Sequence, residues 1–242
     1  MDNTSKLKEI IESYDNIVFF GGAGVSTESG IPDFRSADGL YSESYKYPPE
    51  TMLSYSFFIE HTEEFYDFYR KKLLYPDAKP NDAHIALAEL EREGKLKAVI
   101  TQNVDGLHTL AGSKNVLELH GSALRNICMT CKECYTLDII LKTEGVPFCK
   151  CGGIIKPDVV LYEEGLNPSI MNKAVVAIHD ADVLIVGGTS LNVYPAAGMI
   201  DYYRGNKLIL INKSATPYDR HANLVIRDSI GSVLHAAHRK NA

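Results

Sequence analysis

Short apolar runs recur along the chain and alternate with longer stretches of mixed polarity. The first run, Asn16-Ile-Val-Phe-Phe20, stops at Gly21-Gly22, where a tight turn is expected. Later runs occupy residues 98–101, 116–119, 183–186, 208–211 and 224–226. Continuous apolar runs of this length are typical of parallel strands that are covered on both faces. The pattern therefore predicts a parallel sheet of short, buried strands.

Between these runs, apolar residues recur with the spacing of an amphipathic helix. Residues 82–92 and 170–179 are the clearest examples. The predicted apolar face of the first helix holds Ile85, Leu87, Ala88 and Leu90. Strands that alternate with such helices favour an α/β fold. We therefore expect a Rossmann-like, doubly wound parallel sheet with helices on both faces.

Two stretches interrupt this alternation of strands and helices. Residues 37–79 are rich in aromatic and charged residues, and residues 121–157 hold all five cysteines. Phenylalanines stand at helical spacing in the first stretch, at Phe57, Phe58, Phe65 and Phe68. We expect the two stretches to pack together as a smaller inserted domain. The larger domain would then comprise residues 1–36, 80–120 and 158–242.

The composition limits the classes of partner. The net charge is −6 and the pI is about 5.8, whereas proteins that bind nucleic acid or acidic membranes usually present clustered Lys and Arg. Basic peptides are therefore better partners than nucleic acid or a membrane surface. The apolar runs are much shorter than a membrane span, and the N-terminus lacks the features of a secretion signal. We expect a soluble, cytoplasmic protein.

A glycine-rich turn follows the first predicted strand and is a candidate ligand site. Residues 22–30 read Gly-Ala-Gly-Val-Ser-Thr-Glu-Ser-Gly. We expect them to open a helix whose free N–H groups and dipole hold a diphosphate. The spacing departs from G-x-G-x-x-G because Thr27 stands where the last glycine belongs. The alternative is a glycine turn that only packs a helix against the sheet.

Polar residues come directly after the second predicted strand, in the order Gln102-Asn-Val-Asp105. Open α/β sheets bind ligands at the carboxyl ends of their strands, so these side chains are candidates for ligand contacts. The alternative is that Asn103 and Asp105 cap a helix that begins near Gly106.

The cysteines are spaced as two pairs of metal ligands. Cys128-x-x-Cys131 and Cys149-x-Cys151 lie on turn-forming segments with seventeen residues between the pairs. Four thiolates close a tetrahedron around zinc and leave no open position, so the metal would be structural. Cys134 is the surplus cysteine, and a pair of Cys131 with Cys134 is a rival way to supply one ligand couple. Otherwise Cys134 is a free thiol or a small hydrophobic residue.

Five motifs occur in one order along the chain. They are Gly22-Ala-Gly24-Val-Ser26, Pro32-Asp-Phe-Arg-Ser36, Gln102-Asn-Val-Asp105, His120-Gly121 and Gly188-Thr-Ser-Leu191. With these motifs the chain resembles the sirtuins over nearly its whole length, and most closely their small bacterial branch. The resemblance implies an NAD-dependent enzyme that removes acyl groups from protein lysines. It also implies a Rossmann-like domain, a small domain with a zinc ribbon, and an acyl-lysine tunnel between them.

The resemblance assigns residues to NAD and to the zinc. Those expected around NAD are Ala23, Thr27, Phe34, Arg35, Gln102, Val104, Asp105, His120, Thr189, Ser190, Asn212 and Ile230. Thr189, Ser190 and Asn212 would serve the adenosine half, and Ile230 would lie against the adenine. The family places a non-ligand where Cys134 stands, which favours Cys128, Cys131, Cys149 and Cys151 as the zinc ligands. Acyl-lysine proteins or peptides are the implied partners, and we expect a monomer.

Three residues carry the implied chemistry. His120 would be the general base that takes a proton from the ribose hydroxyls, for which an ordinary histidine pKa of about 6.5 is suitable. Asp105 would bind the carboxamide of nicotinamide, and Asn103 would order the ribose or a water. The products would be free lysine, nicotinamide and O-acyl-ADP-ribose. His84 and His108 lie near predicted helix starts, so a structural hydrogen bond is the preferred interpretation for them.

Two departures from the family pattern bear on the substrate. Glu163 replaces a glycine in a segment, residues 157–164, that pairs with the substrate backbone in many relatives, which have phenylalanine at the position of Tyr162. Relatives that prefer acidic acyl groups carry Tyr-x-x-Arg, and the matching residues here are Tyr66 and Tyr69. Arg70 lies about 100° further round a helix and should point elsewhere. We therefore expect neutral acyl groups to be preferred.

Two other functions are compatible with parts of the sequence. One is a protein ADP-ribosyltransferase that cleaves NAD in the same way but passes ADP-ribose to a protein. The other is a zinc-ribbon or NAD-sensing binding module without catalytic activity. Only the cysteine cluster and the glycine turn support it. The combination of His120, Asn103 and Asp105 favours deacylation over both.

Overall fold

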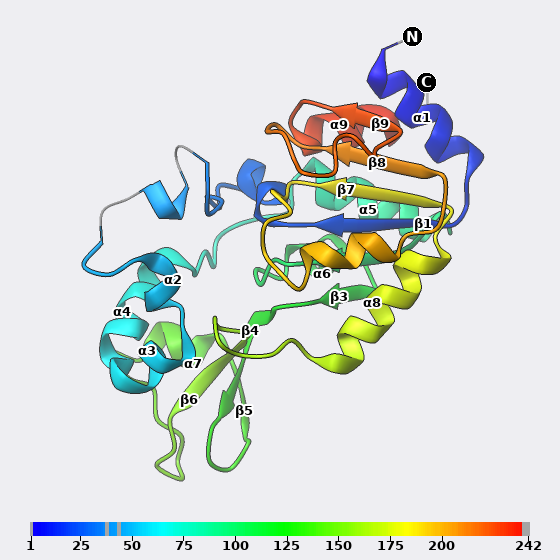
Figure 1. Ribbon diagram of the computed structural model, residues 1–242. Helices are drawn as coiled ribbons and strands as arrows, with labels where there is room; N and C mark the ends of the chain where they lie inside the picture. The colour runs from blue at the N-terminus through cyan, green and yellow to red at the C-terminus, as the bar shows by residue number, and fades with distance from the viewer. Residues whose placement is uncertain (1, 37–38, 43–44, 239–242) are drawn as a thin grey trace.

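A computed structural model describes residues 2–36, 39–42 and 45–238 of the chain (Figure 1). Its larger sheet has six parallel strands in the order β3-β2-β1-β7-β8-β9. The strands are β1 (Ile17–Gly21), β2 (Leu96–Thr101), β3 (Val116–Glu118), β7 (Val183–Gly187), β8 (Lys207–Ile211) and β9 (Leu224–Ile226). Each predicted apolar run lies in one of these strands, with ends that differ by at most two residues. The predicted α/β fold is confirmed.

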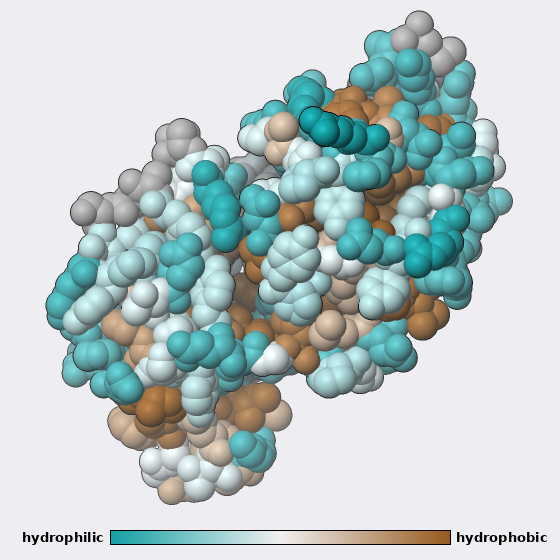
Figure 2. Space-filling view, viewed as in Figure 1, coloured by the Kyte–Doolittle hydropathy of each residue, from teal (hydrophilic) through white to brown (hydrophobic). Residues whose placement is uncertain are grey.

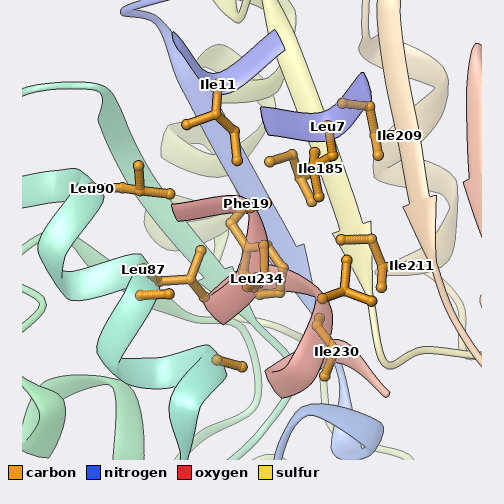
Figure 3. Packing of buried hydrophobic residues seen from close by; sticks show 14 of the residues in the cluster. Leu7, Ile11, Phe19, Leu87, Leu90, Ile185, Ile209, Ile211, Ile230 and Leu234 are labelled. Atoms are coloured by element: carbon orange, nitrogen blue, oxygen red, sulfur yellow. The ribbon is translucent and has the colours of Figure 1, made fainter. Parts of the chain in front are cut away.

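Helices cover both faces of this sheet (Figure 1). One face carries α1 (Asn3–Ser13), α5 (Asp82–Arg92) and α9 (Ile230–His238), and the other carries α8 (Pro168–Asp180) and the 3₁₀ segment η4 (Ala197–Tyr202). Phe19 packs in the cluster of Leu7 and Leu234 (Figure 3), whereas the next residue, Phe20, belongs to the cluster on the opposite face. Burying each such side chain contributes roughly 2–3 kcal/mol. Because both strand faces are buried, the strands are continuous apolar runs in the sequence.

The strand order reverses between β1 and β7, which lie side by side at the centre of the sheet. From this point β2 and β3 continue to one side, and β8 and β9 continue to the other. Open α/β sheets bind their ligands beyond the carboxyl ends of the strands at such a switch point. Gly21 and Gly187 end the two strands as direct neighbours. The fold therefore locates the expected ligand crevice just after these two glycines.

A third apolar cluster lies outside the large sheet. It is shared by the helices α2 (Pro49–Met52), α3 (Tyr55–Glu60), α4 (Thr62–Lys72) and α7 (Asp138–Lys142) and by a three-stranded sheet of β5 (Cys134–Thr136), β4 (Gly121–Cys128) and β6 (Ile155–Val159). Its buried residues include Phe57, Phe58, Phe65, Phe68 and Ile155. Residues from 45–79 and 121–159 thus share one core, while the division of the chain into two domains stays a prediction.

Two local predictions are wrong. The glycine turn does not open an α-helix, because β1 is followed by the 3₁₀ segments η1 (Ala23–Val25) and η2 (Thr27–Ser29). The carbonyl of Val25 is bonded by the Asn81 side chain at 2.8 Å instead of by a later helical N–H, and Gly30 turns the chain with a φ of 82°. Ile85 is 44% exposed although its helix α5 forms as predicted, because Ala83, Ala86 and Leu87 provide the buried face.

Among the helices of residues 2–36, 39–42 and 45–238, none combines the length and the apolar character that crossing a bilayer requires.

Candidate functional site

The loops that follow β1 and β7 contact one another closely. The Gly24 N–H donates to the carbonyl of Gly188 at 2.8 Å, and Gly188 has a φ of 59°. A Cβ atom on Gly188 would lie 2.4 Å from the backbone nitrogen of Val25, and one on Gly24 would lie 2.8 Å from the Gly188 Cα. Both glycines are therefore required for the two backbones to approach. This contact fixes the floor of the crevice at the switch point.

A cleft of about 1360 Å³ begins at these loops and extends between the large sheet and the apolar cluster that contains Phe57 and Phe65. The surface is visibly hollowed between the two lobes of the molecule (Figure 2). Every residue expected at the cofactor or in catalysis lines this cleft: Ala23, Thr27, Phe34, Arg35, Gln102, Asn103, Val104, Asp105, His120, Thr189, Ser190, Asn212 and Ile230. The segments that carry them lie far apart in the sequence, and the fold brings them to one cavity.

Ser26 connects the two polar residues that follow β2. Its hydroxyl donates to Asp105 Oδ2 at 2.7 Å, and Asn103 Nδ2 donates to the Ser26 Oγ at 3.0 Å. Asp105 Oδ1 also accepts from the N–H of Leu107 at 2.9 Å, so this carboxylate serves the start of helix α6 (Leu107–Ala111) as well. Ser26 is 1% exposed. No role was predicted for this serine, although it stands in the glycine-rich motif and a buried hydroxyl in a turn needs a hydrogen-bond partner.

His120 follows β3 and is held through one ring nitrogen. Its Nδ1 lies 2.9 Å from the carbonyl oxygen of Gln102, a group that can only accept, so Nδ1 carries the proton. Nε2 is then left with its lone pair. Burial lowers the pKa of His120 below its ordinary value, although the hydrogen bond to Gln102 acts in the opposite direction. The ring is therefore neutral at neutral pH and available as a proton acceptor.

The side chains at the ends of β2 and β7 are linked. Gln102 Nε2 donates to Thr189 Oγ1 at 3.1 Å, and the same oxygen accepts the N–H of Leu191 at 3.2 Å. Thr27 Oγ1 donates to the carbonyl of Gly24 at 3.0 Å within the glycine-rich turn. Asn212, after β8, uses its amide to bind the carbonyl of Ser214. These bonds fix polar side chains around the crevice before a ligand binds.

The sequence pattern of the Sir2 family matches residues 22–195, which is most of the chain. The chain belongs to the Sir2 family. An NAD-dependent protein deacetylase of Clostridium tetani is 65% identical over 97% of this chain and 96% of its own length. One of Clostridium acetobutylicum is 63% identical over 97% of both chains. A solved Sir2 complex with a p53 peptide and NAD⁺ is 38% identical, has a TM-score of 0.85, and covers 97% of this chain and 96% of its own.

Four of the cysteines of this Sir2 family member form one cluster. The Sγ atoms of Cys128, Cys131, Cys149 and Cys151 all lie within 4.8 Å of one another. Two of the distances between sulfurs are 3.5 Å, close to the value of about 3.8 Å that tetrahedral zinc at 2.3 Å from each sulfur requires. Cys134 is exposed and does not belong to the cluster. The donor set and its spacing fit a structural zinc.

The surroundings of the cluster also fit a bound metal. The Tyr135 hydroxyl donates to Cys149 Sγ at 3.0 Å, as expected for a group that supports a zinc thiolate. Gly153 lies against the cluster, and a Cβ there would be 2.8 Å from Cys128 Sγ. The Cys149 N–H donates to the Gly153 carbonyl at 2.8 Å and holds the second cysteine pair on a tight turn. A side chain at position 153 would therefore displace a ligand.

Two tyrosines and an arginine on α4 lie in or near the wall of the cleft. Tyr69 is fully buried and lines the cleft, and its hydroxyl has no hydrogen-bond partner among the described residues. Tyr66 donates its hydroxyl to the carbonyl of Ile155. Arg70 Nε donates to the carbonyl of Ile140 at 2.8 Å, and Nη2 donates to the carbonyl of Gly145. Arg70 therefore points toward α7 and the turn after it, as its position on the helix predicts.

Glu163 adopts a left-handed backbone conformation that favours glycine. Its φ is 76°, in the left-handed region that costs a residue with a side chain roughly 1–2 kcal/mol. Its carboxylate accepts hydrogen bonds from the N–H and the hydroxyl of Ser56, each at 2.9 Å, at the start of α3. The charge that Glu163 adds beside the cleft is thus engaged by two donors, and these bonds offset the strain.

His84 and His108 form a buried pair behind the polar site. Asn81 and His84 make a capping box at the start of α5, which confirms the structural role expected for His84. His108 differs, because neither of its ring nitrogens has a partner among the described residues. The two rings lie 4.6 Å apart, and both side chains are at most 2% exposed. Burial lowers the pKa of each ring, so both are neutral at neutral pH.

Proposed function

We propose that this chain is an NAD-dependent protein-lysine deacetylase that transfers the acyl group to ADP-ribose and releases nicotinamide. The observation that carries this proposal is the position of His120. Its Nδ1 is bound by the Gln102 carbonyl, which leaves Nε2 free in the cleft that also holds Asn103 and Asp105. The two clostridial relatives, identical at 63% and 65% of positions, bear the name of this activity.

The residues of the cleft divide into those that hold NAD and those that act on the reaction. Ala23, Thr27, Phe34 and Arg35 would surround the dinucleotide, while Thr189, Ser190, Asn212 and Ile230 would serve its adenosine half. NAD, when bound, supplies the ADP-ribose that receives the acyl group. Gln102, Val104 and Asp105 would face the nicotinamide ribose. The position of the cleft at the switch point of the sheet supports this orientation.

The proposed proton acceptor is the Nε2 of His120. A neutral histidine whose Nδ1–H is fixed by a carbonyl keeps one orientation, so its lone pair is directed without a rotational cost. The Ser26 hydroxyl is hydrogen-bonded to both Asp105 and Asn103. Asp105 would bind the nicotinamide carboxamide and Asn103 a ribose hydroxyl or water. We infer that Ser26 keeps these two side chains in the geometry that binding requires.

The substrate proposed for this cleft is a lysine that carries a neutral acyl group such as acetyl. Tyr69 stands where relatives selective for acidic chains have arginine, and Arg70 is engaged by two backbone carbonyls. A carboxylate beside Tyr69 would therefore not meet the Arg70 guanidinium, and burying a carboxylate without a cationic partner costs several kcal/mol. The peptide around the lysine would lie between residues 160–164 and Val193, both of which line the cleft.

Zinc would be held by Cys128, Cys131, Cys149 and Cys151 and would have a structural role. Four thiolates complete its coordination, so it would stabilise the fold of the ribbon and leave no position for a substrate. The proposal further includes acylated proteins as the physiological partners, a monomeric state and action in the cytoplasm. The net charge of −6 is compatible with basic peptides as substrates.

Nicotinamide release tests this function. The purified chain is incubated with NAD and one peptide that carries either acetyl-lysine or unmodified lysine. We expect nicotinamide release only with the acetylated peptide and a decrease of about 10² to 10⁴ in the rate for His120→Ala. Release without the acetylated peptide, or normal turnover by His120→Ala, would contradict the proposal. ADP-ribose attached to a protein would identify a transferase instead.

A further inference from the structure

Two tyrosine hydroxyls join segments of the cleft that are distant in the sequence. The Tyr41 and Tyr162 oxygens lie 2.8 Å apart, which is the distance of a good hydrogen bond between hydroxyls, across 121 positions of the chain. Tyr41 belongs to the short 3₁₀ segment η3 (Leu40–Ser42), and Tyr162 follows β6. Tyr162 lines the cleft and is 38% exposed. No role is predicted from the sequence for either hydroxyl.

Tyr41 is tied to the residues proposed to contact NAD. Its N–H donates to the carbonyl of Phe34 at 2.8 Å, and the two rings meet edge to face with centroids 5.6 Å apart. The guanidinium carbon of Arg35 lies 5.2 Å from the centroid of the Tyr41 ring. The position of the Tyr41 ring therefore sets the position of both neighbouring side chains on the wall of the cleft.

Tyr162 is tied to the catalytic and substrate side. Two residues before it, the Val160 N–H donates to the carbonyl of His120 at 2.9 Å. The Tyr162 N–H donates to the Leu53 carbonyl and its own carbonyl accepts from Tyr55, both at 3.0 Å. The backbone of Tyr162 is thus held on both sides, so the side chain that bonds Tyr41 extends from a fixed segment of the chain.

We propose that the hydrogen bond between Tyr41 and Tyr162 positions Phe34 and Arg35 for NAD and couples their placement to the segment that binds the acyl-peptide. Both tyrosines are positioning residues, because they act through Phe34 and Arg35. The inference rests on the proposed deacetylase function. Tyr→Phe at either position removes only the hydroxyl and keeps the ring, so each variant removes this hydrogen bond alone.

Steady-state kinetics of Tyr41→Phe, Tyr162→Phe and the double variant test the proposal, with an acetyl-lysine peptide at saturation and NAD varied. A neutral hydrogen bond shifts an equilibrium by about three- to tenfold. We expect each single variant to raise KM for NAD by that factor and to keep kcat within about twofold of the wild type. The double variant should equal either single variant, because both changes remove the same bond. Tyr202→Phe, an exposed tyrosine on η4, is the matched control and should behave as the wild type.

Thermal unfolding and zinc content separate positioning from a general structural role. Both should be the same in the variants and the wild type, because each variant keeps its ring. An unchanged KM for NAD, single effects that multiply in the double variant, or a KM that rises only together with a lower Tm would each overturn the proposal. Absence of turnover in the wild type would instead contradict the deacetylase function, so the two failures are distinguishable.

Discussion

The buried pair of His84 and His108 should make the stability of the fold depend on pH below neutrality. Both rings are neutral in the folded protein because burial lowers their pKa below the ordinary value of about 6.5. In the unfolded chain both are exposed and take up protons as the pH falls through 6.5. The unfolded state then binds more protons than the folded state, so the free energy of unfolding decreases as the pH is lowered.

The size of this loss of stability follows from the difference between the pKa of each histidine in the folded protein and its pKa in the unfolded chain. A histidine that stays neutral in the fold and has a pKa near 6.5 when unfolded loses about 2 kcal/mol of stability between pH 7.5 and pH 5. The pair should therefore lose about 4 kcal/mol, a large share of the stability of an ordinary domain. The lowered pKa of His120 adds to the same trend. The Asp105 carboxylate near His84 opposes it, because its negative charge favours the protonated ring.

Urea denaturation at pH 7.5, 6.5, 5.5 and 5.0 measures this effect, with His108→Gln as the comparison. His108 is suitable because its ring nitrogens have no hydrogen-bond partner among the described residues, so no such bond is removed. Other titrating groups are common to both proteins and cancel in the difference. We expect the wild type to lose about 2 kcal/mol more than the variant between pH 7.5 and pH 5. A difference that is independent of pH would refute the argument.

Three further predictions follow from the site. Cys149→Ala should release zinc and unfold the ribbon, whereas Cys134→Ala should retain one zinc per chain, and metal analysis with the opposite result would show that the ligands are misassigned. The acidic limb of the kcat/KM profile should have an apparent pKa below 6.5, because burial keeps His120 neutral, and a limb above 6.5 would exclude His120 as its source. The wild type should prefer acetyl-lysine over succinyl-lysine by at least about 10²-fold in kcat/KM. Tyr69→Arg should move that ratio toward succinyl, and equal efficiency of the wild type on both peptides would contradict the assignment of the pocket.

The central strands could be predicted because each is buried on both faces. Ile17 and Phe19 enter one core and Val18 and Phe20 the other, so no polar position interrupts the run. The same reasoning misplaced Ile85, because helical spacing alone does not decide which edge of an apolar face is covered. Which residues of the helix are covered depends on the elements that pack against it, and the tertiary fold sets that packing.

The site was less predictable than the sheet. Its members were identified through the resemblance, but Ser26 and the two tyrosine hydroxyls make contacts 77 to 121 positions away, and no local pattern indicates such contacts. The prediction of a helix after the glycine turn was wrong for a related reason. Asn81, which is 56 positions away from Val25, bonds the carbonyl that a helix would have used. The conformation of Glu163 likewise depends on donors in a distant helix.

The fate of the acyl group tests the central claim most directly. A peptide with acetyl-lysine that is labelled with ¹³C in the acetyl carbonyl is incubated with the protein and NAD, and all products are analysed by mass spectrometry. A deacetylase of this type should place the label on ADP-ribose, with one nicotinamide and one free lysine for each labelled product. Label recovered only as acetate from the start of the reaction, or ADP-ribose attached to a protein while the acetyl-lysine remains intact, would contradict the account.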